Sequence, residues 1–230
     1  MTTTPVPIRD AASILLIDRN AVDGPSVLMG QRGKAAAFMP MKYVFPGGAL
    51  DPDDHRAGFA CPLPPLSVSR LGREVLEGST ATPEGLAAAA LRELVEETGL
   101  ICGAPDAAPI DWPGYATLGM RPDPSGLIYI FRAITPPHLS RRFDTRFFLM
   151  DSAQIHGDPH DFSQACDELS NIHWVPLPQA RQLDLPFITE IVLAEVSALL
   201  NAAGDAPLGE PEGVPFFDNR SNEPRFLQIT

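Results

Sequence analysis

The sequence predicts an α/β fold in which one mixed β-sheet lies between helices. Several short segments are rich in β-branched and aromatic residues and are bounded by turn-forming residues, which is typical of strands. Two longer segments, 82–99 and 186–204, have helical signals instead. Strands and helices do not alternate regularly along the chain, so a strict series of parallel β-α-β units is not expected.

The first predicted strands precede a Pro-Gly-Gly turn. We expect strands at 11–19 and 25–32, joined by the turn-rich segment NAVDG. The segment KYVFPGG, residues 42–48, begins extended and ends in the Pro-Gly-Gly turn. Residues 49–80 contain DPDD, CPLPP and scattered glycines, so we interpret them as a largely irregular insertion with a short helix at about 67–77.

The next helix has clear signals at both ends. Thr82 can cap its N-terminus, Pro83 suits the first helical position, and Glu84 lies in the first turn, where the helix dipole favours a negative charge. Gly99 follows Thr98 and supplies a left-handed stop. These signals predict a helix that ends at about Thr98.

The second half of the chain supplies more strands and one further helix. The predicted strands are 115–122, 126–134, 144–152 and 168–177. The amphipathic helix at 186–204 ends at Gly204. The segment 205–230 is rich in Gly and Pro and is predicted to be a loose tail, which leaves a single domain at 1–204.

Composition narrows the classes of partner. The 230 residues carry a net charge of −12 without a basic stripe, so no nucleic-acid partner is expected. Three separated cysteines without a CxxC pair argue against a disulfide framework or structural zinc and favour a reducing, cytoplasmic location. No signal peptide or apolar run of about 20 residues is visible, so no membrane partner is expected. Because the chain is acidic overall, an anionic substrate would need an arginine or a divalent cation to offset its charge.

The stretch ALRELVEETGL, residues 90–100, gathers three carboxylates on one side of a helix. With Glu93 at zero, Glu97 lies at about 40° and Glu96 at about 300° on a helical wheel. Leu91 and Leu94 lie on the opposite arc. One face can therefore pack on a sheet, while the other is densely anionic.

This anionic face needs compensation. Like charges four residues apart destabilise a helix by a few tenths of a kcal/mol. Arg92 can pair with Glu96, but one arginine cannot balance three glutamates. Mg²⁺ or Mn²⁺ prefers oxygen ligands and commonly also holds phosphate oxygens. The residues alone leave two interpretations open, a metal site for phosphate chemistry or an ordinary solvated helix face.

The segment RELVEETGL, Arg92 to Leu100, resembles the core of the Nudix box, R-E-U-x-E-E-x-G-U, in which U is aliphatic. The resemblance implies a Nudix-type α/β/α sandwich that hydrolyses nucleoside diphosphates linked to another moiety. It implies that Glu93, Glu96 and Glu97 hold Mg²⁺ or Mn²⁺. It also implies catalytic roles for Glu93, Glu97 and Arg92, with Glu93 or a carboxylate from a later loop accepting a proton from the attacking water.

Two alignments of the box glycine compete. Gly78 and Glu84 stand at the spacings of the full box, whereas Gly48 of FPGG stands about thirty residues earlier than in a typical member. We favour Gly48, with 49–80 as an insertion, because YVFPGGALDPDD and RRFDTRFFL resemble a long-insert branch that includes animal peroxisomal acyl-CoA diphosphatases. In this alignment the Gly48 carbonyl approaches the metal.

The resemblance also suggests substrate-binding residues. Arg32 stands where coenzyme A-cleaving relatives carry an arginine, and Glu168, or its neighbour Asp167, stands where family members often supply another acid. The chain lacks the His and Gly that usually precede FPGG in those relatives, which weakens coenzyme A as substrate. Coenzyme A or acyl-CoA is the first candidate substrate, and ADP-ribose or a nucleotide sugar is the alternative. A Nudix-fold nucleotide-binding module without activity is a further alternative. The insertion and the tail are candidates for shaping the pocket or a homodimer contact.

Overall fold

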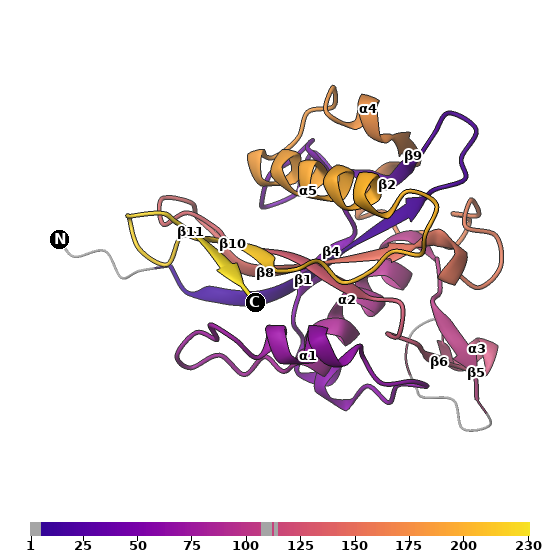
Figure 1. Cartoon of the computed structure of the whole chain (residues 1–230), viewed down its shortest axis with the longest axis horizontal. Coiled ribbons are helices and arrows are strands. Elements are labelled where there is room, and N and C mark those ends of the chain that lie inside the picture. Colours follow the sequence, from indigo (N-terminus) through magenta and orange to yellow (C-terminus); the bar gives the residue numbers. More distant parts are fainter. Residues whose placement is uncertain (1–5, 107–111, 113–114) are drawn as a thin grey trace.

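The computed structural model describes residues 6–106, 112 and 115–230 and has three layers. A mixed β-sheet lies in the middle (Figure 1). Helix α5 (Phe187–Ala203) covers one face, and helices α1 (Pro65–Leu71) and α2 (Pro83–Thr98) cover the other. The predicted α/β fold with a mixed sheet between helices is confirmed.

The strand order of the sheet is β11-β10-β7-β8-β1-β2-β3, with β4 pairing β1 and β9 pairing β2. Strand β1 runs parallel to β8 but antiparallel to β2 and β4, which makes the sheet mixed. The strands are β1 (Ile8–Asp18), β2 (Ser26–Arg32), β3 (Tyr43–Val44), β4 (Gly47–Ala49), β7 (Ile128–Ile134), β8 (Arg142–Asp151), β9 (Leu169–Pro176), β10 (Val214–Asp218) and β11 (Arg225–Ile229).

Two predicted elements need correction. The segment expected to be a strand at 115–122 is helical at α3 (Tyr115–Leu118) and extended only at β6 (Met120–Pro122), which pairs with β5 (Gly103–Pro105). The buried Tyr115 hydroxyl donates to the Cys102 carbonyl, and this distant contact outweighs the local strand preference. The helix expected at 67–77 is α1, which ends at Leu71 before Gly72. The described residues also form the short helices α4 (Leu177–Ala180), η1 (Pro52–Arg56) and η2 (Ser152–Gln154).

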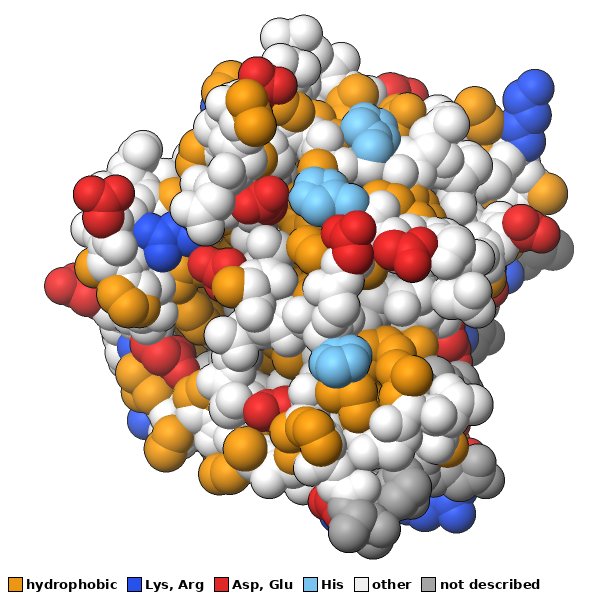
Figure 2. All heavy atoms as spheres, turned by 90° about the vertical axis from the view of Figure 1, so that its right-hand side faces the viewer, with side chains coloured by type: hydrophobic (Ala, Val, Ile, Leu, Met, Phe, Trp, Pro, Cys, Tyr) orange, Lys and Arg blue, Asp and Glu red, His pale blue; other side chains and the backbone are white. Residues whose placement is uncertain are grey.

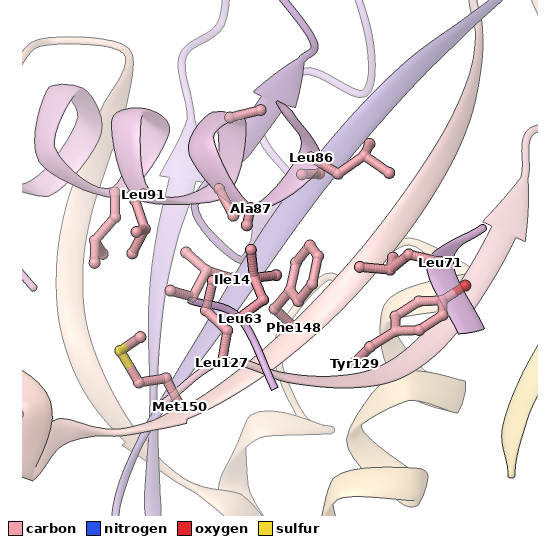
Figure 3. Close-up of a cluster of buried hydrophobic side chains, with 14 of the residues drawn as sticks. Ile14, Leu63, Leu71, Leu86, Ala87, Leu91, Leu127, Tyr129, Phe148 and Met150 are labelled. Atoms are coloured by element: carbon pink, nitrogen blue, oxygen red, sulfur yellow. The ribbon is translucent and has the colours of Figure 1, made fainter. Parts of the chain in front are cut away.

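The apolar face of α2 packs directly on the sheet. Leu86, Ala87 and Leu91 point toward Ile14 and Phe148 (Figure 3). The run from Ala87 to Ala90 is fully buried, and these small side chains let the helix lie close to the strands. On the opposite face of β1, Leu15 and Ile17 belong to the core under α5. Strand β1 is therefore buried on both faces, which explains its continuous apolar sequence.

Strand β8 places its buried charged side chains, Asp144 and Arg146, on one face of the sheet. On the face toward α1 and α2, the buried Arg132 donates to both oxygens of Asp144 at 2.8 and 2.7 Å, and Arg146 donates to Asp10 at 2.6 Å. Breaking such a buried pair costs more than its formation contributes, so the network disfavours any other register of β1, β7 and β8. The alternate residues of β8, including Phe143, face the side of α5.

The predicted loose tail is wrong. Strand β10 pairs in parallel with β7, and β11 pairs antiparallel with β10, so the C-terminal segment extends the central sheet. Phe216 is fully buried, with the guanidinium of Arg132 4.3 Å from its ring centroid. Burial of an aromatic side chain and the sheet hydrogen bonds outweigh the Gly- and Pro-rich composition of the segment.

The surface, the cysteines and the helices provide three further observations. Acidic side chains are spread over the face shown in Figure 2, and basic ones lie mainly near its edge. Cys61, Cys102 and Cys166 are all free. Within the described ranges, none of the helices combines the length and the apolar character needed to cross a membrane.

Candidate functional site

A pocket of about 490 Å³ opens on the α5 side of the sheet. Strand β1 pairs with β2 only near Ile17 and Asp18, and β4 pairs with β1 from Ala11 to Ser13. At β4 the C-terminal half of α2 reaches the pocket, and Glu93 and Glu97 form part of its wall. The N-terminus of α5 contributes Pro186 to Thr189 on another side.

Two of the three carboxylates on the acidic side of α2, Glu93 and Glu97, face protein and not bulk water. Glu97 is 3% exposed, and its Oε2 accepts a hydrogen bond from the Gly47 N–H at 2.9 Å. The Glu93 side chain is 13% exposed and belongs to the same pocket wall. The interpretation of this segment as an ordinary solvated helix face is therefore wrong.

Gly48 provides the space for Glu93. A Cβ atom at Gly48 would overlap the Glu93 carboxylate, so a larger residue here would displace that side chain from its observed position. Gly78 instead lies in an open turn, where a Cβ atom would meet no other atom within 4 Å. Of the two glycines that compete for the box position, Gly48 is the one beside the carboxylates.

Arg92 joins the carboxylates to the insertion. Its Nη1 donates to Glu93 at 2.9 Å and to Glu96 at 3.0 Å, so the predicted Arg92–Glu96 contact is confirmed. Its Nε and Nη2 donate to the two oxygens of Asp54 at 2.9 and 3.1 Å, and Nη2 also donates to the Ala49 carbonyl. Sequence reasoning missed Asp54, which is 1% exposed. The DPDD signal predicts a capped turn, but no local signal predicts that Asp54 contacts Arg92.

The site holds more negative charge than its protein partners neutralise. Burial raises the pKa of Glu97 to about 8, opposed by the Gly47 N–H, while Glu93 and Glu168 raise this pKa further and Arg32 lowers it. Burial also raises the pKa of Glu93, against the lowering effect of Arg92. A divalent cation would relieve this repulsion and favour the charged forms of both groups.

The residues fit Mg²⁺ or Mn²⁺ by donor type and charge, because the donors are buried carboxylate oxygens that lack cationic partners sufficient to balance them. Across the described part of the chain, no three His, Cys, Asp or Glu side chains form a ready-made metal-binding group.

The remaining predicted residues divide into two groups. Arg32 and Glu168 line the same pocket as Glu93 and Glu97, although they come from β2 and from the residue before β9. The Nε atom of Arg32 is buried and has no hydrogen-bond partner among the described residues. Glu96 is absent from the pocket wall, and its side chain is 39% exposed and held by Arg92.

Sequence reasoning missed several residues of the pocket wall. Ser13 lies opposite Gly47 in the β1–β4 pairing, and Phe143 lies opposite Arg9 in the β1–β8 pairing. Arg141 and Phe38 line the same pocket. These residues share a site only because β1, β4 and β8 pair in this register, and a single sequence does not reveal pairing between distant segments.

Two proteins of known family resemble this chain over most of its length. No family model matches the chain. It is 29% identical over 182 residues to "Putative nudix hydrolase 7" of Caenorhabditis elegans, which covers 73% of this chain and 51% of that protein. The chain thus spans about half the length of this relative. It is also similar to the crystal structure of a NUDIX hydrolase from Alicyclobacillus acidocaldarius, with 29% identity, a TM-score of 0.60, and coverage of 89% of this chain and 99% of the other.

The chain has the Nudix fold. Both relatives support a place in the Nudix hydrolase family. In this Nudix fold, the segment that resembles the box core forms the C-terminal half of α2. The FPGG turn packs against it, although Gly48 precedes Glu93 by 45 residues in the chain. The insertion returns to the same place through Asp54.

Proposed function

We propose that this chain is a divalent-metal-dependent hydrolase that cleaves the diphosphate bond of a nucleoside diphosphate derivative. One observation carries the proposal. The buried Glu97 and its neighbour Glu93 meet the Gly47–Gly48 turn in the wall of a pocket, and burial raises the pKa of both carboxyl groups. Such an arrangement is costly without a cation and suits a substrate whose phosphates share that cation.

We assign the metal-binding role to Glu93 and Glu97, with Glu96 at the outer side and the Gly48 carbonyl as a further ligand. A bound Mg²⁺ or Mn²⁺ would neutralise the diphosphate and lower the pKa of a water molecule. Arg92 holds the Glu93 carboxylate in a fixed orientation, because Asp54 fixes the guanidinium from the other side.

The other residues act on the substrate and the water. Glu93 or Glu168 accepts the proton of the attacking water. The water oxygen then bonds to phosphorus, the bond to the bridging oxygen breaks, and two products result, each with one of the two former diphosphate phosphorus atoms as a terminal phosphate monoester. Arg32 donates to a phosphate oxygen, which would satisfy its unpartnered Nε.

Coenzyme A or acyl-CoA is the first proposed substrate. The pocket continues from the carboxylates along an apolar wall that includes Phe45, Phe147 and Ile188, which could accommodate a long, partly apolar leaving half. The absence of His and Gly before FPGG favours ADP-ribose or a nucleotide sugar as the second candidate. Retention of all three glutamates favours hydrolysis over a binding module without turnover.

The first experiment measures hydrolysis with Mg²⁺ or Mn²⁺ for coenzyme A, acyl-CoA esters, ADP-ribose and NADH, with products identified by mass. Glu97→Gln should reduce kcat by at least about 100-fold, because the amide cannot supply the charge that holds the cation. Glu84→Gln is the matched control, since Glu84 is exposed and lies about 13 Å from Glu93 along the same helix.

The control variant should keep nearly the wild-type rate. Full activity of Glu97→Gln would show that the metal assignment is wrong. Tight binding of one compound by the wild-type protein, without turnover of any, would support the binding-module alternative.

A further inference from the structure

The far end of the pocket contains two arginines that the proposed function does not use. Arg9 and Arg141 both line the pocket and are exposed. Within residues 6–106, 112 and 115–230, neither side chain has a hydrogen bond or an ion pair. The acidic residues of the pocket wall are Glu93, Glu97 and Glu168. Glu93 and Glu97 lie on α2, and Glu168 is close enough to raise the pKa of both. The pocket therefore has an acidic end and a basic end.

The sheet register places the two arginines beside each other. Arg9 lies opposite Phe143 in the parallel β1–β8 pairing, and Arg141 lies two residues before Phe143, so both project on the same face. Their Cα atoms are then about 8 Å apart, a separation that lets two long side chains converge on one small anion. Ser13, opposite Gly47 at the acidic end, is four residues or about 13 Å further along β1.

An apolar and aromatic surface lies between the two ends. The rings of Phe38 and Phe143 contact edge to face with centroids 5.5 Å apart, and both residues line the pocket. Ala11 and Thr145 occupy the positions on β1 and β8 that follow toward the acidic end. A flat aromatic group such as a nucleobase can pack on this surface, while a sugar bridges it to the phosphates.

We infer that Arg9 and Arg141 bind a second phosphate group, carried on the ribose of the nucleoside half of the substrate. This inference rests on the proposed function, because it places the diphosphate at the glutamate end. Two guanidinium groups match a phosphate monoester in charge and in hydrogen-bond geometry. Substrates with a ribose phosphate are then preferred over otherwise identical substrates without it.

The test separates nucleotide binding from turnover. Calorimetric titration with Mg²⁺ compares adenosine 3′,5′-bisphosphate with adenosine 5′-monophosphate on the wild-type protein, on the double variant Arg9→Gln/Arg141→Gln, and on Arg181→Gln. Arg181 is an exposed arginine after α4 that does not line the pocket. The wild-type protein and Arg181→Gln should bind the bisphosphate at least about tenfold more tightly, and the double variant should lose this preference.

A kinetic comparison provides the second readout. The ratio of kcat/KM for coenzyme A to that for 3′-dephospho-coenzyme A should fall in the double variant, with little change for the dephosphorylated compound. Equal binding of both nucleotides by the wild-type protein, or a preference that persists in the double variant, overturns the inference. Failure to hydrolyse either compound contradicts coenzyme A as the substrate in the proposed function, whereas the nucleotide titration still decides the role of the two arginines.

Discussion

At the scale of single residues, Glu97 lies in an environment that is unfavourable for its charge. It is almost completely buried, it lies near Glu93 and Glu168, and its direct hydrogen-bond donor is the Gly47 N–H. Burial raises its pKa from the ordinary value of 4.5 to about 8. The folded protein without metal therefore retains a proton on this group at pH values where the unfolded chain has lost it.

This proton predicts how the stability of the metal-free protein depends on pH. Because the folded-state pKa lies above the unfolded-state value, the contribution of Glu97 to stability is complete below about pH 4.5 and is lost as pH rises toward 8. Thermal unfolding in EDTA at several pH values between 5 and 8.5 should show a falling Tm. Glu97→Gln should reduce this slope, and an unchanged slope would contradict the assignment of the buried proton.

Added metal should stabilise the folded protein more at high pH than at low pH. A divalent ion requires the deprotonated carboxylates, so it binds the folded protein more strongly as pH rises through the same range. The increase in Tm on addition of Mg²⁺ or Mn²⁺ should therefore be larger at pH 8 than at pH 6. Glu97→Gln should show a smaller increase at both pH values. A metal-induced shift that is independent of pH and of this substitution would place the ion elsewhere.

At the scale of elements, the insertion contributes directly to the orientation of α2. Its first turn, η1, begins with a capping box in which Asp51 caps and the Asp54 side chain accepts from the Asp51 N–H. This fixes the Asp54 carboxylate for its two hydrogen bonds with Arg92. Arg92 in turn contacts Glu93, so residues of the insertion determine the position of a proposed metal ligand.

Asp54→Asn should destabilise the fold by about 3 kcal/mol, because it removes the fully buried carboxylate that accepts from Nε and Nη2 of Arg92 and leaves only Glu93 and Glu96 to balance the guanidinium. It should also lower kcat through displacement of Glu93. Asp53→Asn is the matched control, since Asp53 forms an exposed ion pair with Arg56, and its loss should change stability by less than about 1 kcal/mol. Urea unfolding and the hydrolysis rate measure both effects. Equal behaviour of the two variants would exclude a positioning role for Asp54.

At the scale of the whole molecule, the C-terminal strands complete the central sheet. Phe216 on β10 packs in the same core as α2, and Asp218 accepts hydrogen bonds from Arg220 and Arg225. Arg132 connects this region to β8 through its contacts with Phe216 and Asp144. The C-terminal segment is therefore part of the cooperative unit that supports the pocket, whose wall includes the neighbouring Phe217.

Phe216→Ala should cost about 3–5 kcal/mol in the free energy of unfolding, because it leaves a cavity in the core under the sheet. Phe226→Ala is the comparison variant, since Phe226 on the adjacent β11 is 62% exposed and should cost much less. Denaturant unfolding of both variants measures the difference. If Phe216→Ala were as stable as wild type, the C-terminal segment would not be an integral part of the sheet.

The sequence by itself determined the elements whose signals are local. Helix α2 runs from Pro83 to Thr98, Thr82 accepts from the Gly85 N–H, and Gly99 has a φ of 76°, all as the end signals predict. The three glutamates share one side of this helix because the helical period fixes their directions. The fold class also followed, because the periods of strands and helices depend mainly on nearby residues.

Only the tertiary structure decided which distant residues share the site. Arg92 contacts Asp54 across 38 residues, and Arg9 reaches the vicinity of Arg141 through the β1–β8 register. The two C-terminal strands likewise form because β7 offers an edge and the core accepts Phe216, although their own composition favours a loop. Such contacts depend on the free energy gained when separate segments pack together, and no local pattern in one segment reports which partner it will meet.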